Sequence, residues 1–267
     1  ALHLFMLMVV FFVLPFGIPD IQSLDGKEPT WLLLSIMSMT VGFPFFVLSS
    51  TSPMIQRWFS ATNHPSAADP YFLYAASNVG SLLALLSYPF LVERWVGLYE
   101  QSMFWMGGYI VFVLCMTGCT FFIVRGTSSP VETKEKEKNE ILSIWTRVRW
   151  VALAFVPSSL MLSVTSYVST EIASTPLLWV LPLALYLLSF SLVFSKMFRG
   201  HEIVLRAFPM AVVALTLLLT IRITNPFYLM LVVHMSVFFV VAMACHGKLA
   251  ENRPSSSKIT EFYLSGA

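Results

Sequence analysis

The chain has 267 residues, of which 57% are hydrophobic and 11% are charged, and its formal net charge is +2; its mean hydropathy is +0.77. So few polar groups cannot cover a soluble globule of this size, and the composition therefore predicts a protein that resides in lipid. The small net charge, without a basic groove interleaved with exposed aromatic residues, argues against a nucleic-acid partner.

Apolar runs that are long enough to cross a bilayer recur along the whole chain. A helix needs roughly 20 apolar residues to cross about 30 Å of hydrocarbon. Eight segments approach or exceed that length, near residues 1–18, 31–50, 70–92, 102–124, 148–170, 176–195, 207–223 and 226–246. Most tryptophans fall near segment ends, as in the aromatic belts of membrane proteins: Trp31, Trp58, Trp95, Trp105, Trp145, Trp150 and Trp179. The expected fold is all-α, a polytopic integral membrane helical bundle of about eight transmembrane helices.

Three of these segments begin with a side-chain acceptor followed by proline. The pairs are Asp69-Pro70, Thr175-Pro176 and Asn225-Pro226. The acceptor is expected to cap the helix, and proline fits the first turn, where its missing N–H is not needed. The links 171–175 and 224–225 are too short to recross a bilayer, so their flanking segments are expected to form antiparallel hairpins.

Lys and Arg concentrate in the loops after the even-numbered segments. Of the 16 Lys and Arg residues, only Lys27, Arg94 and Arg222 fall in the opposite loops. Because basic loops stay on the cytoplasmic side, these even loops and the C-terminus are expected to be cytoplasmic.

The same pattern predicts how the chain is organised along its length. We expect a first four-helix half over 1–125, a charged cytoplasmic linker over 126–147, a second four-helix half over 148–246 and a cytoplasmic tail over 247–267. The chain begins inside an apolar run, without an initiator Met or a basic n-region. We therefore expect a piece of a longer protein, in which the tail leads to a further C-terminal part.

The third segment carries small residues at helical spacing. Ala76 and Gly80 are four apart, as are Ser77 and Ser81, which is the spacing that lets helix backbones approach closely. Asn78 lies in the same two turns, about 12 Å below the cytoplasmic end. A polar amide at that depth needs a partner. Asn78 is therefore either an interhelical hydrogen-bonding group or part of a solute path.

Hydroxyl groups form a stripe along the fifth segment. Ser159, Ser163, Ser166 and Thr170 follow one another at spacings of four, three and four. Such a stripe either packs, with each hydroxyl bonded to a carbonyl one turn back, or faces a wet cavity. Glu171 follows at the external end, where it is either a solvated carboxylate or a cation site.

Two histidines lie in the last segment. His234 is about 12 Å from the external side, among Val, Met and Phe residues. An ionisable residue inside a membrane raises a functional hypothesis, although a neutral histidine bonded to a neighbouring helix fits the same pattern. His246 is expected at the cytoplasmic interface, where it caps the last carbonyls of the helix.

The chain lacks the sequence signatures of an active site. There is no Gly-rich phosphate loop, nucleophile elbow, His-Glu-x-x-His or Rossmann fingerprint. Cys115, Cys119 and Cys245 do not form a Cys-x-x-Cys pair. We therefore predict no catalytic residues, no cofactor and no metal site in this chain.

Four stretches resemble the membrane part of the bacterial fused major-facilitator/spermidine synthase proteins, also described as spermidine synthase-like membrane proteins. They are FPFFVLSSTSPMIQRWF (43–59), DPYFLYAASNVGSLLALLSYPFLVE (69–93), FVPSSLMLSVTSYVSTEIASTPLLWVLPLALYLLSFSLVF (155–194), and HMSVFFVVAMACHGKLAENRP with TEFYL (within 234–264). The resemblance therefore covers most of the chain from residue 43 onward. The loop after the second segment lacks the Gly-and-basic motif that major-facilitator carriers usually show.

The resemblance implies a location and a partner. In that family a soluble aminopropyltransferase-like domain of Rossmann methyltransferase type follows the TEFYL motif on the cytoplasmic side. The nucleotide-binding glycines and acidic residues of such a domain are absent here, so its enzymatic activity is not carried over to this chain. The implied location is the bacterial inner membrane.

Three functional hypotheses follow. The first is a non-catalytic membrane module that anchors or serves an aminopropyltransferase-like domain, or moves a small polar or cationic solute. Its candidate path residues are Asn78, Ser159, Ser163, Glu171 and His234. The second is a structural or accessory subunit of a larger membrane complex. The third is an enzyme, if a further C-terminal part supplies the missing domain.

Overall fold

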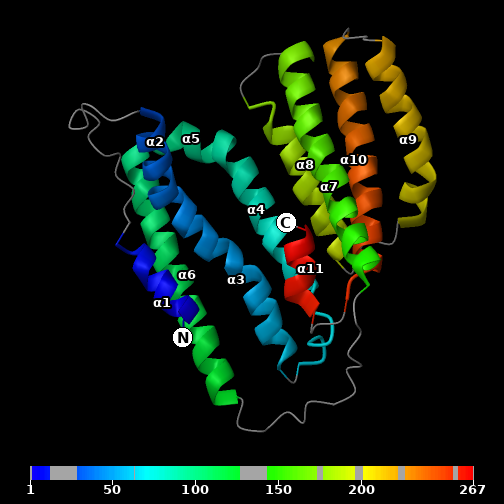
Figure 1. Ribbon diagram of the computed structural model, residues 1–267. Helices are drawn as coiled ribbons and strands as arrows, with labels where there is room; N and C mark the ends of the chain where they lie inside the picture. Colours follow the sequence, from blue (N-terminus) through cyan, green and yellow to red (C-terminus); the bar gives the residue numbers. More distant parts are fainter. Residues whose placement is uncertain are drawn as a thin grey trace. The chain divides into compact units, whose positions relative to one another are not determined.

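The computed structural model describes residues 2–12, 29–62, 64–126, 143–172, 177–195, 201–221, 226–254 and 258–266, and within them all regular structure is helical. The helices are α1 (Leu2–Val10), α2 (Pro29–Met37), α3 (Phe43–Ser60), α4 (Phe72–Ser87), α5 (Glu93–Trp95), α6 (Leu98–Gly126), α7 (Ile144–Tyr167), α8 (Val180–Phe194), α9 (His201–Ile221), α10 (Phe227–Glu251) and α11 (Ile259–Gly266). Figure 1 shows their order along the chain. The predicted all-α class is confirmed.

Five helical runs in the described residues are long and apolar enough to cross a membrane. They are Thr30–Ser60, Phe72–Trp95, Leu98–Ile123, Ile144–Thr170 and Phe227–Glu251. Each coincides with a segment predicted from the sequence, so those five predictions are confirmed in length and composition. The predicted crossings near 1–18, 176–195 and 207–223 correspond to α1, to the shorter apolar helix α8 and to α9. For these three, crossing stays a prediction, and 13–18 lie outside the described residues.

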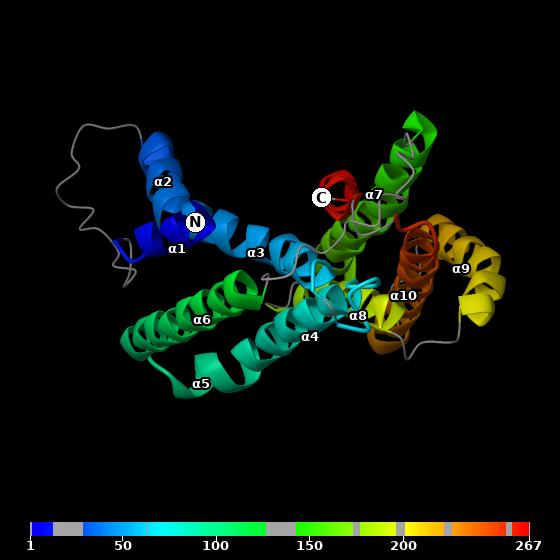
Figure 2. The same cartoon turned by 90° about the horizontal axis from the view of Figure 1, so that it is seen from below.

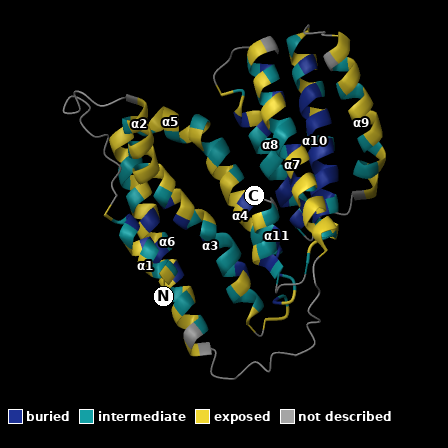
Figure 3. Ribbon diagram, in the orientation of Figure 1, coloured by how far each residue is buried: buried dark blue, intermediate teal, exposed yellow. Residues whose placement is uncertain are grey.

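Large apolar side chains lie on the outer faces of these helices, which is how a chain surrounded by lipid is built. Leu83 on α4, Phe122 on α6 and Val232 on α10 are 64%, 75% and 60% exposed. Figure 3 shows exposed residues along most helices, whereas α10 is largely buried. A soluble monomer rarely leaves so much apolar surface in contact with water. The helices therefore fit a membrane protein.

In the described part of the chain, three segments of π-helix interrupt or extend the long helices. They are Ser38–Gly42, Tyr88–Val92 and Val168–Ile172. The first runs into Pro44 and the second contains Pro89, and a proline removes one backbone donor from the helical ladder. The third follows Tyr167 and ends α7. Such segments are frequent at functional sites, which draws attention to the end of α7.

The chain divides into two compact units, Ala1–Trp58 with Leu91–Lys136, and Phe59–Phe90 with Glu137–Ala267. In the first unit α1 packs against α6, around a core that includes Leu7, Val47 and Val113. The Tyr109 hydroxyl on α6 donates to the Leu7 carbonyl at 2.7 Å, which ties the two helices together. The predicted halves, linker and tail stay predictions, and most of the linker, 127–142, lies outside the described residues.

Helix α10 is the centre of the second unit. It contacts α7, α8 and α9, and Figures 1 and 2 both show it between α9 and the pair α7 and α8. Phe238 and Ala242 are fully buried in its middle. A helix that is apolar all round is expected to be enclosed by others. Helix α4 completes the unit by packing against α8.

At one end of this unit α11 folds back onto the bundle. Ile259 and Phe262 of α11 pack against Trp150 of α7, whose indole Nε1 donates to the Asn252 carbonyl at 2.9 Å. Arg147 on α7 forms a salt bridge with Glu261 at 2.6 Å. The residues after α10 therefore hold the ends of α7 and α10 together.

The predicted capping role of Asp69 is wrong. Helix α4 begins at Phe72 with Tyr71 as its N-cap, and no side chain caps it. Asp69 instead pairs with Arg253 at 3.0 Å, and the Tyr71 hydroxyl donates to the Pro254 carbonyl at 2.9 Å. The carboxylate is thus used in a long-range pair rather than in a local cap.

Candidate functional site

His234 is a buried ionisable side chain in the first half of α10. It is 1% exposed, and its Nδ1 lies 2.7 Å from the Met230 carbonyl oxygen, one turn back on α10. A carbonyl only accepts hydrogen bonds, so Nδ1 carries the proton and, in the neutral ring, Nε2 is left with a lone pair. That Nε2 atom is buried and has no hydrogen-bond partner in the described part of the chain. His234 therefore presents an unused acceptor inside the bundle.

Tyr167 covers one side of the His234 ring. The two rings are stacked, with centroids 5.0 Å apart and an interplanar angle of 26°. Tyr167 is the last residue of α7, directly before the π-helical segment Val168–Ile172. Val168 in that segment and Phe238 of α10 are buried in the same cluster. The end of α7 and the first half of α10 therefore form one packed site.

A groove runs along the outer face of the same part of α7. Its volume is about 520 Å³, and it is lined by Leu162, Ser163, Ser166, Tyr167 and Thr170. Ser163 donates to the Ser159 carbonyl and Thr170 donates to the Ser166 carbonyl, each at 2.8 Å. The predicted hydroxyl stripe thus lines a groove, and each of these two hydroxyls also bonds to its own helix. The bonds to the helix's own carbonyls are those of the packing alternative. That the stripe faces a wet cavity stays a prediction.

The structure therefore brings some predicted site residues together and leaves others apart. Ser163 lines the groove together with Tyr167, and His234 stacks on Tyr167. Ser159 lies one turn before Ser163 on α7 and is outside the groove lining. The backbone of Glu171 is in the π-helical segment, and its side chain lies outside the described residues. Its role as a cation site stays a prediction.

Asn78 is on α4, whose main contact is with α8. It is 8% exposed, and its Nδ2 donates to the Tyr74 carbonyl one turn back at 2.9 Å. This bond within its own helix satisfies one donor of the amide without a neighbouring helix. Asn78 is therefore a buried residue of α4, the helix that packs on α8, whereas Tyr167 ends α7.

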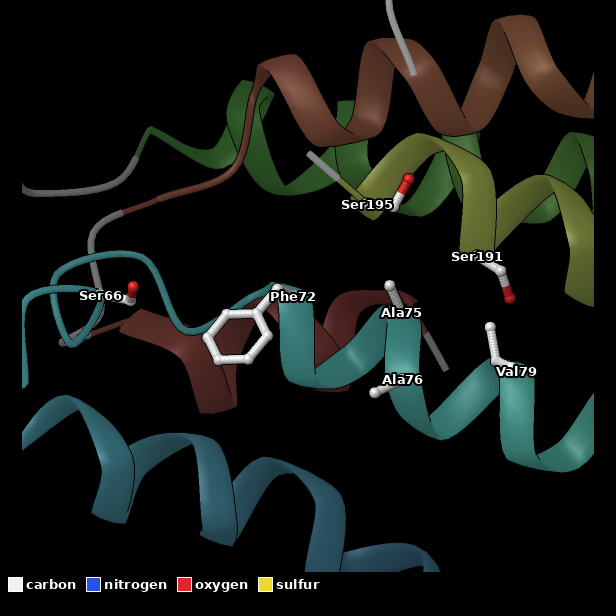
Figure 4. Close-up of a pocket in the computed structure, with 7 residues that line it drawn as sticks. All are labelled: Ser66, Phe72, Ala75, Ala76, Val79, Ser191 and Ser195. Carbon is white, nitrogen blue, oxygen red and sulfur yellow. The ribbon is translucent and has the colours of Figure 1, made fainter. Parts of the chain in front are cut away.

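A second cavity lies between α4 and α8. Its volume is about 440 Å³, and it is lined by Ser66, Phe72, Ala75, Ala76, Val79, Ser191 and Ser195. Figure 4 shows Ala75 and Val79 of α4 pointing toward the α8 side, where Ser191 and Ser195 lie. Ser191 and Ser195 donate to carbonyls of their own helix. The lining is mostly apolar and holds no titratable side chain, so its chemistry is less defined than that around His234.

His246 differs from its sequence prediction. Helix α10 continues to Glu251 with Asn252 as its C-cap, and His246 is fully buried, so the expected capping role is wrong. Its Nδ1 lies 2.8 Å from the Ser189 hydroxyl on α8, and that hydroxyl donates to the Tyr186 carbonyl at 2.7 Å. The ring stacks on Phe190 with centroids 3.7 Å apart. Nε2 is again buried without a partner in the described residues.

The described residues offer no obvious metal centre. No group of three or more His, Cys, Asp or Glu side chains among them is arranged to hold a metal ion. The prediction of a chain without cofactor or catalytic residues stays a prediction. What the site around His234 offers chemically is hydrogen-bond acceptance beside an aromatic ring.

Known proteins add no assignment to this geometry. Comparisons of the chain with protein-family models, with curated proteins and with solved structures each give no match.

Proposed function

We propose that the chain is a non-catalytic, multi-spanning membrane module that moves a small polar or cationic solute through the bundle around α10. The observation that carries the proposal is His234, a buried ionisable residue with an unused Nε2 in a helix long enough to cross a membrane. Polar and ionisable groups are costly within a bilayer and mark substrate and ion pathways when they occur there.

The proposed path runs along α7 and α10. Ser163 and His234 are its central residues, because Ser163 lines the groove with Tyr167 and the Tyr167 ring stacks on the imidazole. Ser159, one turn before Ser163 on α7, extends the proposed path. Asn78 and Glu171 are retained as candidate residues at its periphery. In this proposal the module resembles the membrane part of spermidine synthase-like proteins, and it also anchors or serves a cytoplasmic aminopropyltransferase-like domain.

Uptake of a labelled polyamine into proteoliposomes tests the transport proposal. The His234→Leu variant is expected to lose at least about tenfold in initial rate, which corresponds to ~1.4 kcal/mol of lost interaction. The Asn78→Leu variant tests whether the peripheral residue Asn78 contributes to the uptake rate. Val232→Leu is the matched control, because Val232 is on the outer face of the same helix. Unchanged flux in both His234→Leu and Asn78→Leu would contradict this choice of path residues.

One observation favours a second function, that of a structural or accessory subunit in a larger membrane complex. The small residues Ala76, Ser77, Gly80 and Ser81 of α4 are exposed, whereas Ala75 and Asn78 on the same helix are buried. A Cβ added at Gly80 meets no heavy atom within 4 Å. Packing within the second unit therefore does not require glycine there, while close approach by a further helix would.

Substitution of Gly80 separates this second function from the first. Gly80→Leu is expected to leave the stability of the isolated chain unchanged or slightly raised, because glycine is a poor helix former and the site is open. The same variant is expected to lose a partner that co-purifies at fixed stoichiometry in mild detergent. Gly80→Ala is the conservative control and should retain the partner. A clean monomer from the unaltered chain would count against the accessory role.

The proposed location is the bacterial inner membrane with the C-terminus in the cytoplasm. The support is the distribution of basic residues, since only Lys27, Arg94 and Arg222 fall in the loops assigned to the outside. Alkaline phosphatase fused after residue 267 is active only when exported. An active fusion would overturn the orientation.

A further inference from the structure

The groove on α7 presents hydrogen-bond acceptors. A hydroxyl has one proton, and the protons of Ser163 and Thr170 are used in bonds to the carbonyls of Ser159 and Ser166. The oxygen lone pairs of both side chains remain available to a molecule in the groove. The described lining contains no Lys, Arg or His side chain that would attract an anion.

His234 adds a stronger acceptor behind this groove. Its Nδ1 proton is used by the Met230 carbonyl, which leaves Nε2 as the free lone pair. Tyr167 belongs to both places, because it lines the groove and stacks on the imidazole. The negative face of an aromatic ring attracts cations as well. All these groups therefore favour a ligand that is positively charged and donates hydrogen bonds.

Tyr167 also separates the open groove on α7 from the buried His234. The ring covers one side of His234, which is 1% exposed, while the groove is open. The residue is followed at once by the π-helical segment Val168–Ile172. A π-helical segment differs from an α-helix in its hydrogen-bond register, so a shift between the two moves the residues beside it. Tyr167 is therefore placed where a small helical change uncovers one face of the buried His234 imidazole.

We propose that the groove and His234 are one binding site for an ammonium-type cation, and that the Tyr167 ring closes its inner part. The cation first meets the oxygens of Ser163 and Thr170 and the face of Tyr167. When the Tyr167 ring moves aside, the N–H groups of the cation donate to Nε2 of His234. The proposal rests on the proposed transport function and identifies the ligand chemistry and the gate.

Thiol labelling in nanodiscs tests the site without a transport assay. The full chain is prepared with Cys115, Cys119 and Cys245 replaced by alanine, and a single cysteine is introduced as Ser163→Cys or His234→Cys. The probes are 2-aminoethyl methanethiosulfonate, which carries an ammonium group, and 2-sulfonatoethyl methanethiosulfonate, which carries a sulfonate. Rates are normalised to those of free cysteine, and helical circular dichroism verifies that each variant is folded.

The expected pattern has two parts. Ser163→Cys reacts roughly tenfold faster with the ammonium probe than with the sulfonate probe, because the groove offers acceptors and an aromatic face. The thiol of His234→Cys is protected when residue 167 is Tyr or Phe. When Tyr167→Ala is added to the same variant, its reaction with the ammonium probe becomes at least about tenfold faster than with Tyr167 present.

Two results would overturn the proposal. One is equal normalised rates of the two probes at Ser163→Cys, and the other is a His234→Cys rate that does not depend on the residue at 167. The labelling pattern does not require flux, so it can fail while polyamine uptake succeeds. It can equally hold when uptake fails, which distinguishes the failure of this site from the failure of the proposed function.

Discussion

Replacement of Trp150 by alanine is expected to lower the free energy of unfolding by about 3–5 kcal/mol, as for other fully buried large aromatic residues. Trp150 is 1% exposed and packs edge-to-face on Phe262, with ring centroids 5.1 Å apart. Its indole N–H also satisfies the Asn252 carbonyl. The truncation thus leaves a cavity and an unpaired acceptor where α7, the end of α10 and α11 meet.

Trp145→Ala is the matched control for this prediction. Trp145 is on the same helix but is 77% exposed, so its loss should change stability by no more than about 0.5 kcal/mol. Unfolding of the purified chain in detergent, followed by helical circular dichroism during denaturant titration, measures both variants. Equal destabilisation by the two substitutions would show that the contact between α11 and the bundle contributes little.

Replacement of Ser189 by alanine is expected to cost about 1–3 kcal/mol, because it leaves a fully buried imidazole without its hydrogen bond. His246 Nδ1 is 2.8 Å from the Ser189 hydroxyl, and Nε2 has no other partner in the described residues to compensate. The reason is the asymmetry of buried polar groups, since an unpaired donor keeps the full cost of its lost hydration.

A double variant distinguishes this mechanism from simple loss of packing. Ser189→Ala combined with His246→Phe removes both polar partners while a ring still stacks on Phe190, so stability should recover toward that of the unaltered chain. Ser191→Ala is the control, because that hydroxyl donates to the Leu187 carbonyl of its own helix rather than to a side chain of another helix. The same unfolding titration applies. A double variant that is less stable than Ser189→Ala alone would contradict the explanation.

The tryptophans show that residue type alone does not determine whether a side chain is buried. Most of the seven tryptophans were expected near segment ends as an aromatic belt, and Trp95 and Trp145 are each 77% exposed. Trp150 also lies near the start of a predicted segment, yet its side chain is buried. The difference depends on α11, a helix more than 100 residues later in the chain, which covers one tryptophan and not its neighbour on α7.

The site around His234 divides in a similar way. The sequence already identified the histidine and the hydroxyl stripe, because an ionisable residue in an apolar run and a helical spacing are both local patterns. Tyr167 was not identified, since its position over the imidazole depends on how α7 packs against α10. A tyrosine in an apolar helix has no signal of its own that separates a gate from a core residue.

Length, apolar periods and composition by themselves determined the all-α class, and the eight segments that they predicted include the five helices long and apolar enough to cross a membrane. They could do so because the need for about 20 apolar residues is a property of a single segment. Only the tertiary structure decided the partners of the polar groups. His246 meets Ser189 across 57 residues, and Asp69 meets Arg253 across 184. Local patterns predicted that Asp69 and His246 would cap helix ends. The packing of distant helices instead gave each of these two residues a side-chain partner far away in the sequence.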